Sequence, residues 1–360
     1  MAQPALAASS QRPTVRIDGQ PQSMVTGLIQ AVQVTEQEGG MSSLELRLSN
    51  QITVPGAEAS LAFEDEKILK LGTKVAIYCG DTTGTPIEVF RGKITAFEAE
   101  FSDKPPELVV LAEDVFQEAR MTRRTKAWKD SSIADVAKAV AKQLNLTPKV
   151  IGLSDKFPWL VQLNESDLAF LRRLLTRHDA DMQVIGDDMH VMARKDADRG
   201  AVDLHFQDEI RFARVLADLS QQVTEVTVTG WDYKQGRRIN KKSTGSFLRP
   251  GQGRTGPTLL SDALGPRSEH VGDPGMLNDE EAQALADTIF DRRARPFVSV
   301  EATVVTGNPK VHVGTQVNLT GLGSRFSNSY YVVRCMHKYD LTEGYVTNFH
   351  AESAYLGAAS

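Results

Sequence analysis

The chain has 360 residues, of which 41% are hydrophobic, and its formal net charge is −5. This length can bury two or three hydrophobic cores, and the acidic balance argues against nucleic acid as the main partner. Two cysteines are too few for a disulfide framework, and no apolar run approaches the roughly eighteen residues that a membrane helix requires.

The N-terminal part begins with a short polar arm, followed by strands. Residues 1–12 are small and polar and lack the basic and apolar regions of a signal peptide. We therefore expect a flexible arm, on a protein that stays in the cytoplasm during assembly. Alternating apolar residues at 28–37 and 43–50 predict strands of a first β-domain over 13–120.

A motif in this half recurs near the C-terminus. GTKVAI at 72–77 and GTQVNL at 314–319 both read G-T-x-V-x-aliphatic, and each is followed by two alternating strands. Those strands begin at Phe90, Leu108, Tyr330 and Tyr345. The shared order indicates a duplicated β-unit, with chance similarity of β-rich stretches as the alternative. We expect two similar antiparallel β-barrel domains, the second over 206–360.

A mixed α+β region is expected over 121–205, between the two β-domains. Its first helix should span 132–144, because Ser132 and Asp135 form a capping pattern ahead of apolar residues at helical spacing. A hairpin over 182–194 should turn at 186–188, where the sequence reads Gly-Asp-Asp.

The corner VQLNESDLAFLRRLL at 161–175 should join a strand to a second helix. Val161 and Leu163 alternate as in a half-buried strand, and either Asn164 or Ser166 can cap the helix that follows. Four leucines recur at helical spacing in that helix, at positions 168, 171, 174 and 175. An ordinary capping arrangement accounts for this corner physically.

The stretch 233–275 has little periodicity and should form a long loop in the second β-domain. Seven basic residues and no acidic residue lie between 233 and 261. A solvated loop is one interpretation, and a contact surface for an acidic neighbouring subunit is the other. The candidate interface residues are Lys234, Arg237, Arg238, Lys241, Lys242, Arg249 and Arg254. After this loop, Asn278 and Glu281 should start a helix that leads into a strand at 297–306.

Motifs that carry catalysis or bind cofactors are missing from the sequence. A G-x-G-x-x-G match at 251–256 has no preceding strand and no helical pattern after Pro257, so nucleotide binding is not expected. The seven histidines lack metal-ligand spacing, and the carboxylate pairs lie in turns or helix starts. We expect no enzyme activity, no cofactor and no metal.

The corner at 161–175 resembles the Q-x-x-E-S-D-x-x-F-L-x-R-L corner of phage late-control D proteins and of the front half of VgrG proteins. The helix after Asn278, with the G-N-P turn at 307–309, extends this resemblance to roughly residues 15 to 355. The signature residues, which we interpret as structural, are Gln162, Glu165, Ser166, Asp167, Phe170, Leu171, Arg173 and Leu174.

The resemblance implies a structural baseplate hub of a phage tail or contractile injection system. In that family three copies form a ring whose two similar barrels per copy match the hexameric tail tube. A spike protein on a separate chain, the tail tube and other baseplate subunits would be its partners in the assembled particle. One alternative comes from residues 128–146, which resemble a LysM-like element and would imply cell-wall binding. A hydrolase with a site assembled across domains is the other.

Overall fold

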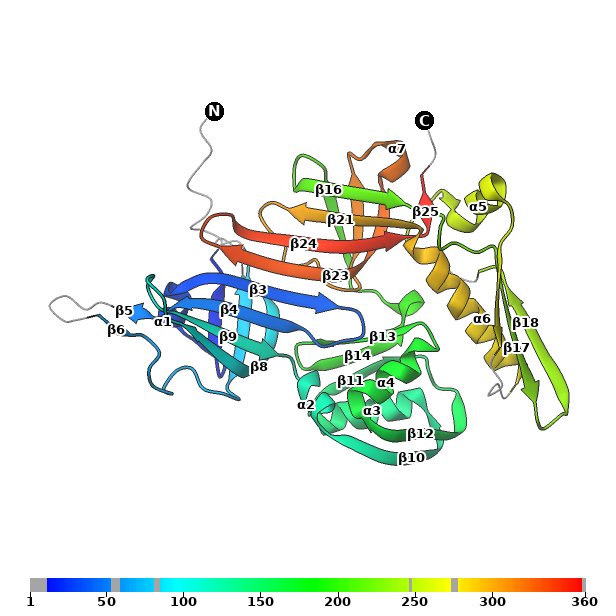
Figure 1. Ribbon diagram of the computed structural model, residues 1–360, viewed down its shortest axis with the longest axis horizontal. Helices are drawn as coiled ribbons and strands as arrows, with labels where there is room; N and C mark the ends of the chain where they lie inside the picture. The colour runs from blue at the N-terminus through cyan, green and yellow to red at the C-terminus, as the bar shows by residue number, and fades with distance from the viewer. Residues whose placement is uncertain (1–11, 53–58, 81–84, 246–247, 273–277, 358–360) are drawn as a thin grey trace.

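The computed structural model describes residues 12–52, 59–80, 85–245, 248–272 and 278–357. Strands dominate, as expected. An α+β region lies between two β-rich parts in the sequence, and in Figure 1 it lies below both of them. The predicted arm at 1–12 lies outside the described residues, apart from Arg12. Among the described residues, no helix combines the length and the apolar composition that crossing a bilayer requires.

The first β-unit contains six strands that lie side by side, and every neighbouring pair in it is antiparallel. In spatial order they are β3 (Ile29–Gln37), β4 (Ser43–Ser49), β9 (Glu107–Glu113), β8 (Ile87–Glu100), β7 (Lys74–Cys79) and β1 (Thr14–Ile17). Shorter elements of this half are β2 (Gln20–Pro21), α1 (Ser23–Gly27), β5 (Gln51–Ile52) and β6 (Ser60–Leu61).

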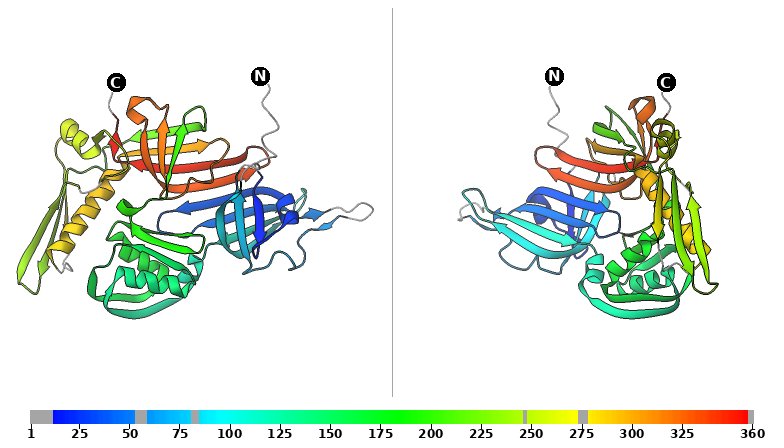
Figure 2. Two further views of the ribbon diagram at one scale, coloured as in Figure 1. Left: turned by 180° about the vertical axis from the view of Figure 1, so that it is seen from behind. Right: turned by 45° about the vertical axis from the view of Figure 1, so that its right-hand side comes forward.

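The second β-unit has six strands in the equivalent order. They are β16 (Ile210–Ala217), β21 (Val298–Val304), β24 (Gly344–Ser353), β23 (Asn328–Asp340), β22 (Gln316–Thr320) and β15 (Ala201–His205). The two units differ at their last pair, because β15 is parallel to β22 whereas β1 is antiparallel to β7. Pairing of β23 with β3 joins both units into one sheet of thirteen strands among the described residues (Figure 2).

The predicted duplication extends to single hydrogen bonds. In the first unit, the amide of Gly72 donates to the carbonyl of Ile94 at 2.8 Å, and in the second unit the amide of Gly314 donates to Val332 at 2.8 Å. Both glycines have positive φ, which explains why each repeated motif starts with glycine. A β-bulge follows Ile94 in β8 and Val332 in β23. The repeated Gly-Thr motif therefore marks one structural unit that is present twice.

The middle region follows the expected α+β order. Its elements are α2 (Phe116–Met121), β10 (Arg123–Ser132), α3 (Ile133–Gln143), β11 (Thr147–Ile151), β12 (Lys156–Ser166), α4 (Asp167–Thr176), β13 (Ala180–Ile185), β14 (Asp188–Ala193) and a 3-10 turn at Arg194–Asp196. Ser132 and Asp135 cap α3 reciprocally, and the hairpin β13–β14 turns at Gly186, both as predicted. Ser166, rather than Asn164, caps α4.

The strand before α4 faces the opposite way from the prediction. Val161 and Leu163 are 48% and 69% exposed, whereas Gln162 between them is fully buried. The Gln162 side-chain amide donates to Asp167 at 2.9 Å and to the backbone oxygen of Glu165 at 3.0 Å. Turning this polar residue inward satisfies the buried start of α4, and the apolar alternation of 161–163 is therefore on the solvent side.

The predicted long loop at 233–275 is wrong, because most of it has regular structure. After β17 (Glu225–Asp232) come β18 (Arg237–Ser243), β19 (Arg254–Thr255), α5 (Gly256–Leu264) and β20 (Ser268–Gly272). The single apolar residue of β18, Ile239, is fully buried. The other six residues of the strand are polar, so its sequence lacks the alternation of apolar residues that would predict a strand. The expected absence of a helix after the glycine motif is also wrong, since Thr255 caps α5 with Pro257 in its first turn.

The predicted helix after Asn278 is confirmed as α6 (Asp279–Ala294), capped by the Asn278 side chain. The remaining elements are a 3-10 turn (Arg295–Phe297), α7 (Gly323–Phe326) and β25 (Tyr355–Leu356). Four buried apolar clusters form the cores, over residues 15–112, 116–191, 204–351 and 223–294. The first also takes in Tyr339 and Tyr345, so the second unit contributes to the core of the first.

Candidate assembly surfaces

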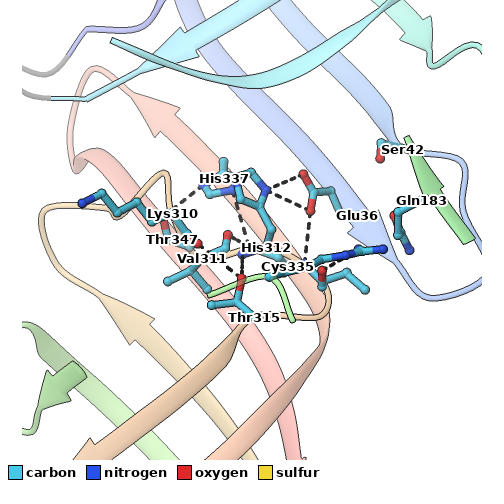
Figure 3. A network of polar contacts seen from close by, with 12 residues as sticks. Glu36, Ser42, Gln183, Lys310, Val311, His312, Thr315, Cys335, His337 and Thr347 are labelled. Atoms are coloured by element: carbon cyan, nitrogen blue, oxygen red, sulfur yellow. Dashed lines mark hydrogen bonds and ion pairs between the residues drawn. The ribbon is translucent and has the colours of Figure 1, made fainter. Parts of the chain in front are cut away.

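The junction between the two β-units contains a partly buried ion pair, in which the side chains of Glu36 and His312 are 12% and 31% exposed. Glu36 on β3 faces Cys335 on β23, and His312 comes from the turn before β22 (Figure 3). The Nδ1 atom of His312 lies 2.9 and 3.2 Å from the two Glu36 carboxylate oxygens, and the Val313 amide donates to the same carboxylate at 3.3 Å. Side chains from both units therefore complete one polar contact.

Charge coupling sets the protonation of this pair. Burial alone would raise the pKa of Glu36, but the charge and hydrogen bond of His312 outweigh it and hold that pKa below its ordinary value. Burial would likewise lower the pKa of His312, and the Glu36 carboxylate outweighs it, so the His312 pKa is raised. The two shifts agree in describing a carboxylate beside an imidazolium.

A second histidine behind the pair is neutral. His337 is fully buried, and burial followed by the nearby charge of His312 lowers its pKa to about 4. Its Nδ1 lies 2.8 Å from the Tyr345 hydroxyl, and its Nε2 lies 3.5 Å from the sulfur of Cys335. Burial raises the pKa of the Cys335 thiol well above its usual value, so the sulfur is an unreactive thiol.

These side chains include a possible metal-ligand set that sequence spacing did not reveal. Glu36, His312 and His337 each offer a ligand atom within 4.8 Å of the others. A bound zinc ion would need the His312 proton to leave and the 2.9 Å hydrogen bond to Glu36 to open. In the present arrangement the three groups have one another and their neighbours as hydrogen-bond partners. The cluster therefore stabilises the junction between the two units.

A cavity of about 300 Å³ beside the junction is lined by Glu36, Asp114, His190 and Arg199, among others. Burial raises the pKa of Asp114 to about 6, a value that would suit a general acid. Its carboxylate, however, accepts the backbone amides of Ser42 at 2.6 Å and Phe116 at 2.9 Å. Asp114 thereby fixes the start of α2, which is a structural role.

The seven predicted basic interface residues lie on or near β18 and β19. Arg237 and Lys241 both contact Asp279 on α6, at 3.0 and 3.3 Å. Lys242 contacts Glu225 at 2.8 Å, and Arg254 contacts Asp262 at 2.5 Å. Acidic residues outside 233–261 therefore balance much of the positive charge that the sequence window showed. Lys234, Arg238 and Arg249 complete the set.

The signature residues of the corner hold α4 against the middle core. Phe170, Leu171 and Leu174 are buried in that core, together with the Gln162 and Asp167 pair described above. Arg173 grips Glu165 with two hydrogen bonds of 2.8 and 3.0 Å across the corner. The corner is thus a packing and capping device.

Comparison with known proteins identifies the family. The family model described as the Alg8 N-terminal domain matches residues 10–340, so the chain belongs to this family. A probable baseplate hub protein of Escherichia phage P2 is 30% identical over 101 residues, covering 27% of this chain and 26% of that protein. Its counterpart in Escherichia phage 186 is 32% identical over 97 residues, covering 26% and 25%. The match therefore spans about a quarter of the length of these relatives.

Solved structures share the fold over nearly the whole chain. The 43 kDa tail protein of prophage MuSo2 from Shewanella oneidensis has a TM-score of 0.70 at 14% identity, covering 95% of this chain and 98% of that one. A tail protein from Neisseria meningitidis MC58 has a TM-score of 0.66 at 12% identity, covering 96% and 99%. An E. coli component of the type VI secretion system has a TM-score of 0.57 at 10% identity, covering 96% and 79%. The chain is thus related to phage baseplate hub proteins and has the fold of phage tail and VgrG-like proteins.

Proposed function

We propose that this late-control D and VgrG-like protein is a structural baseplate hub of a phage tail or contractile injection system. Three copies form a ring that joins a hexameric tail tube to a central spike on a separate chain. The names of its relatives support a baseplate role. The trimeric ring and its contacts with the tube and the spike are inferred from the resemblance of the sequence to this family.

The observation that carries this proposal is the duplicated β-unit. Six strands in one order, with the same glycine contact and the same bulge, occur twice in the chain. Three copies would present six equivalent units, which is the number that a hexameric tube requires. Other baseplate subunits would then contact the outward surfaces, including the β17–β18 arm.

The division of the chain into a first β-domain at 13–120, a middle region at 121–205 and a second β-domain at 206–360 belongs to the same proposal. Three of the buried clusters follow these bounds closely. The fourth cluster, formed by β17, β18 and α6, supports a separate arm inside the second domain. In this proposal the two β-units are the barrels of the ring.

A structural role rather than catalysis fits the titratable groups described above. Asp114 accepts two backbone amides beside α2, Glu36 pairs with His312, and Cys335 is a buried thiol. Each of these three groups thus has a local structural partner, whereas a catalytic site needs groups aimed at a substrate.

The mass of the native assembly tests the proposal. Native mass spectrometry of the purified chain is expected to give a species of three times the 39.5 kDa chain mass. After coexpression with its spike protein, the same trimer is expected to carry the additional mass of the spike. A chain that stays monomeric in both samples, even at high protein concentration, would contradict the proposed trimeric ring.

A further inference from the structure

The strands of the sheet that have an edge without a neighbour among the described residues include β16 and the end of β8. β16 pairs with β21 along its length, and an isolated bridge joins its first residue, Ile210, to Phe206. The rest of its other edge is free at the end of the sheet (Figure 1). β8 pairs with β7 up to Lys93, and beyond that residue it pairs with β9 alone. The segment from Ala96 to Glu100 therefore also has a free edge. Unpaired edges of this kind are templates for another strand.

The duplication matches each of these two edges with a strand in the other β-unit. The shared register with β9 and β24 makes β8 the equivalent of β23, so that Phe97 matches Cys335. The shared register with β4 and β21 makes β16 the equivalent of β3, so that Val215 matches Val34. β23 and β3 pair with each other inside the chain. The free edges of β8 and β16 are thus equivalent to the edges of β23 and β3 that pair with each other inside the chain.

Exposure of the matched positions supports this correspondence. Cys335 and Tyr339 lie where β23 pairs with β3, and they are 0% and 4% exposed. Their equivalents on the free edge, Phe97 and Phe101, are 37% and 68% exposed. On the free edge of β16, Leu216 is 53% exposed. Large apolar side chains at strand edges are aggregation hazards unless a partner covers them.

Transposing the β23–β3 register predicts the facing residues. Phe97 would lie opposite Ala217 and Phe101 opposite Ala213, so large side chains on one edge face small ones on the other. On the opposite face of the sheet, Glu100 would lie opposite Arg214. Neither Glu100 nor Arg214 has an ion-pair partner among the described residues, so each is free to pair across the contact.

We propose that the 96–101 edge of β8 pairs antiparallel with β16 of a second copy of this chain, in the register of the β23–β3 junction. The contact is head-to-tail, so repeating it closes a ring when the rotation permits. Alternating the internal junction with this intermolecular one would continue a single sheet around the ring. The number of chains in the ring, three, rests on the proposed hub function, whereas the two edges and their register come from the structure.

Cysteine trapping tests the register. Glu98 and Leu216 are exposed, and the register places them opposite each other, as Met336 lies opposite Thr35 in the junction. The double variant Glu98→Cys, Leu216→Cys is expected to form disulfides between copies under mild oxidation, giving bands of two and three chains on a non-reducing gel. Both native cysteines are buried and do not interfere. Glu98→Cys with Phe212→Cys is the matched control, because position 212 lies on the same face of β16 but four residues away from position 216.

Running native mass spectrometry on the same samples separates the possible outcomes. Crosslinks in the 98/216 variant alone support the proposal. A native trimer without those crosslinks, or with equal crosslinking in the 98/212 control, overturns this contact and leaves the ring hub standing. A chain that neither crosslinks nor associates overturns both this contact and the trimeric hub.

A charge exchange gives a second, independent readout. Arg214→Glu alone and Glu100→Arg alone should each weaken association by roughly tenfold, because like charges would then face each other. The double variant restores an opposite pair and should recover most of the wild-type association. Double-variant association no better than that of the single variants would overturn the proposed facing of these two residues.

Discussion

Replacing Glu36 with Gln should loosen the junction between β3 and β23 by an amount that depends on pH. Glu36 is 9% exposed, and its carboxylate is the counter-charge of His312 at 2.9 Å. Glutamine keeps the shape and one acceptor oxygen but removes the charge, which leaves the partly buried imidazolium of His312 without its counter-charge. We expect a loss of about 1–3 kcal/mol, the usual cost of an unsatisfied buried polar group.

The pH dependence follows from the two pKa shifts. The His312 pKa is raised from 6.5, so its stabilising effect is complete below 6.5 and is lost as pH rises through the higher folded value. The Glu36 pKa is lowered from 4.5, so its effect is complete above 4.5 and is lost as pH falls through the lower folded value. The ion pair therefore contributes fully between 4.5 and 6.5, and the cost of Glu36→Gln should be largest there.

Hydrogen–deuterium exchange is the suitable assay, because it reports on β3 and β23 separately from the other cores. Protection of both strands should fall in Glu36→Gln at pH near 5.5 and approach that of the wild type at a pH well above the His312 pKa, once intrinsic exchange rates are corrected. Glu45→Gln on the neighbouring β4 is the control, since Glu45 is partly exposed and pairs with Arg47 at the surface. A loss of protection that is equal at both pH values would refute the ion-pair explanation.

Three further variants test other parts of the molecule. Ser132→Ala removes the reciprocal cap of α3 and should cost about 1 kcal/mol, seen as faster exchange in that helix, while unchanged exchange would deny the cap a role. Gly307→Ala should destabilise the second unit strongly, because φ is positive there and a Cβ would lie 2.2 Å from the Tyr345 ring; a wild-type melting temperature would contradict this packing. The double change Lys241→Glu, Lys242→Glu should reduce particle formation without unfolding the chain, and unchanged particle yield with a folded hub would remove the basic surface from the assembly.

Sequence reasoning worked where the signal is local. Ser132 with Asp135 and Asn278 with Glu281 predicted two helix starts, because capping needs only residues three positions apart. The Gly-Thr motif predicted the duplication, because the backbone of each copy has a positive φ at this position and glycine is the residue that adopts it most easily. A search for alternating apolar residues missed β18, where Ile239 is the only apolar residue of the strand.

Features that depend on the tertiary fold could not be predicted in this way. Glu36 and His312 are 276 positions apart, so no spacing rule connects them. Gln162 is buried because a charged residue five positions later needs its amide, which overrides the apolar alternation on either side of it. The ion pairs of the basic stretch could not be predicted from its own residues, because its acidic partners Glu225 and Asp279 lie outside 233–261.

The two copies of the strand junction, one observed and one proposed, have different side chains for a physical reason. The β23–β3 junction forms within one chain, so it can bury a charged pair whose partners need never be separated. The proposed β8–β16 contact must instead form between chains that first exist alone in water. An edge that alternates Phe97 and Phe101 with Glu98 and Glu100 combines apolar area for association with charges that oppose unspecific pairing. Because a shift of one residue would exchange these two faces, the charges also favour a single register.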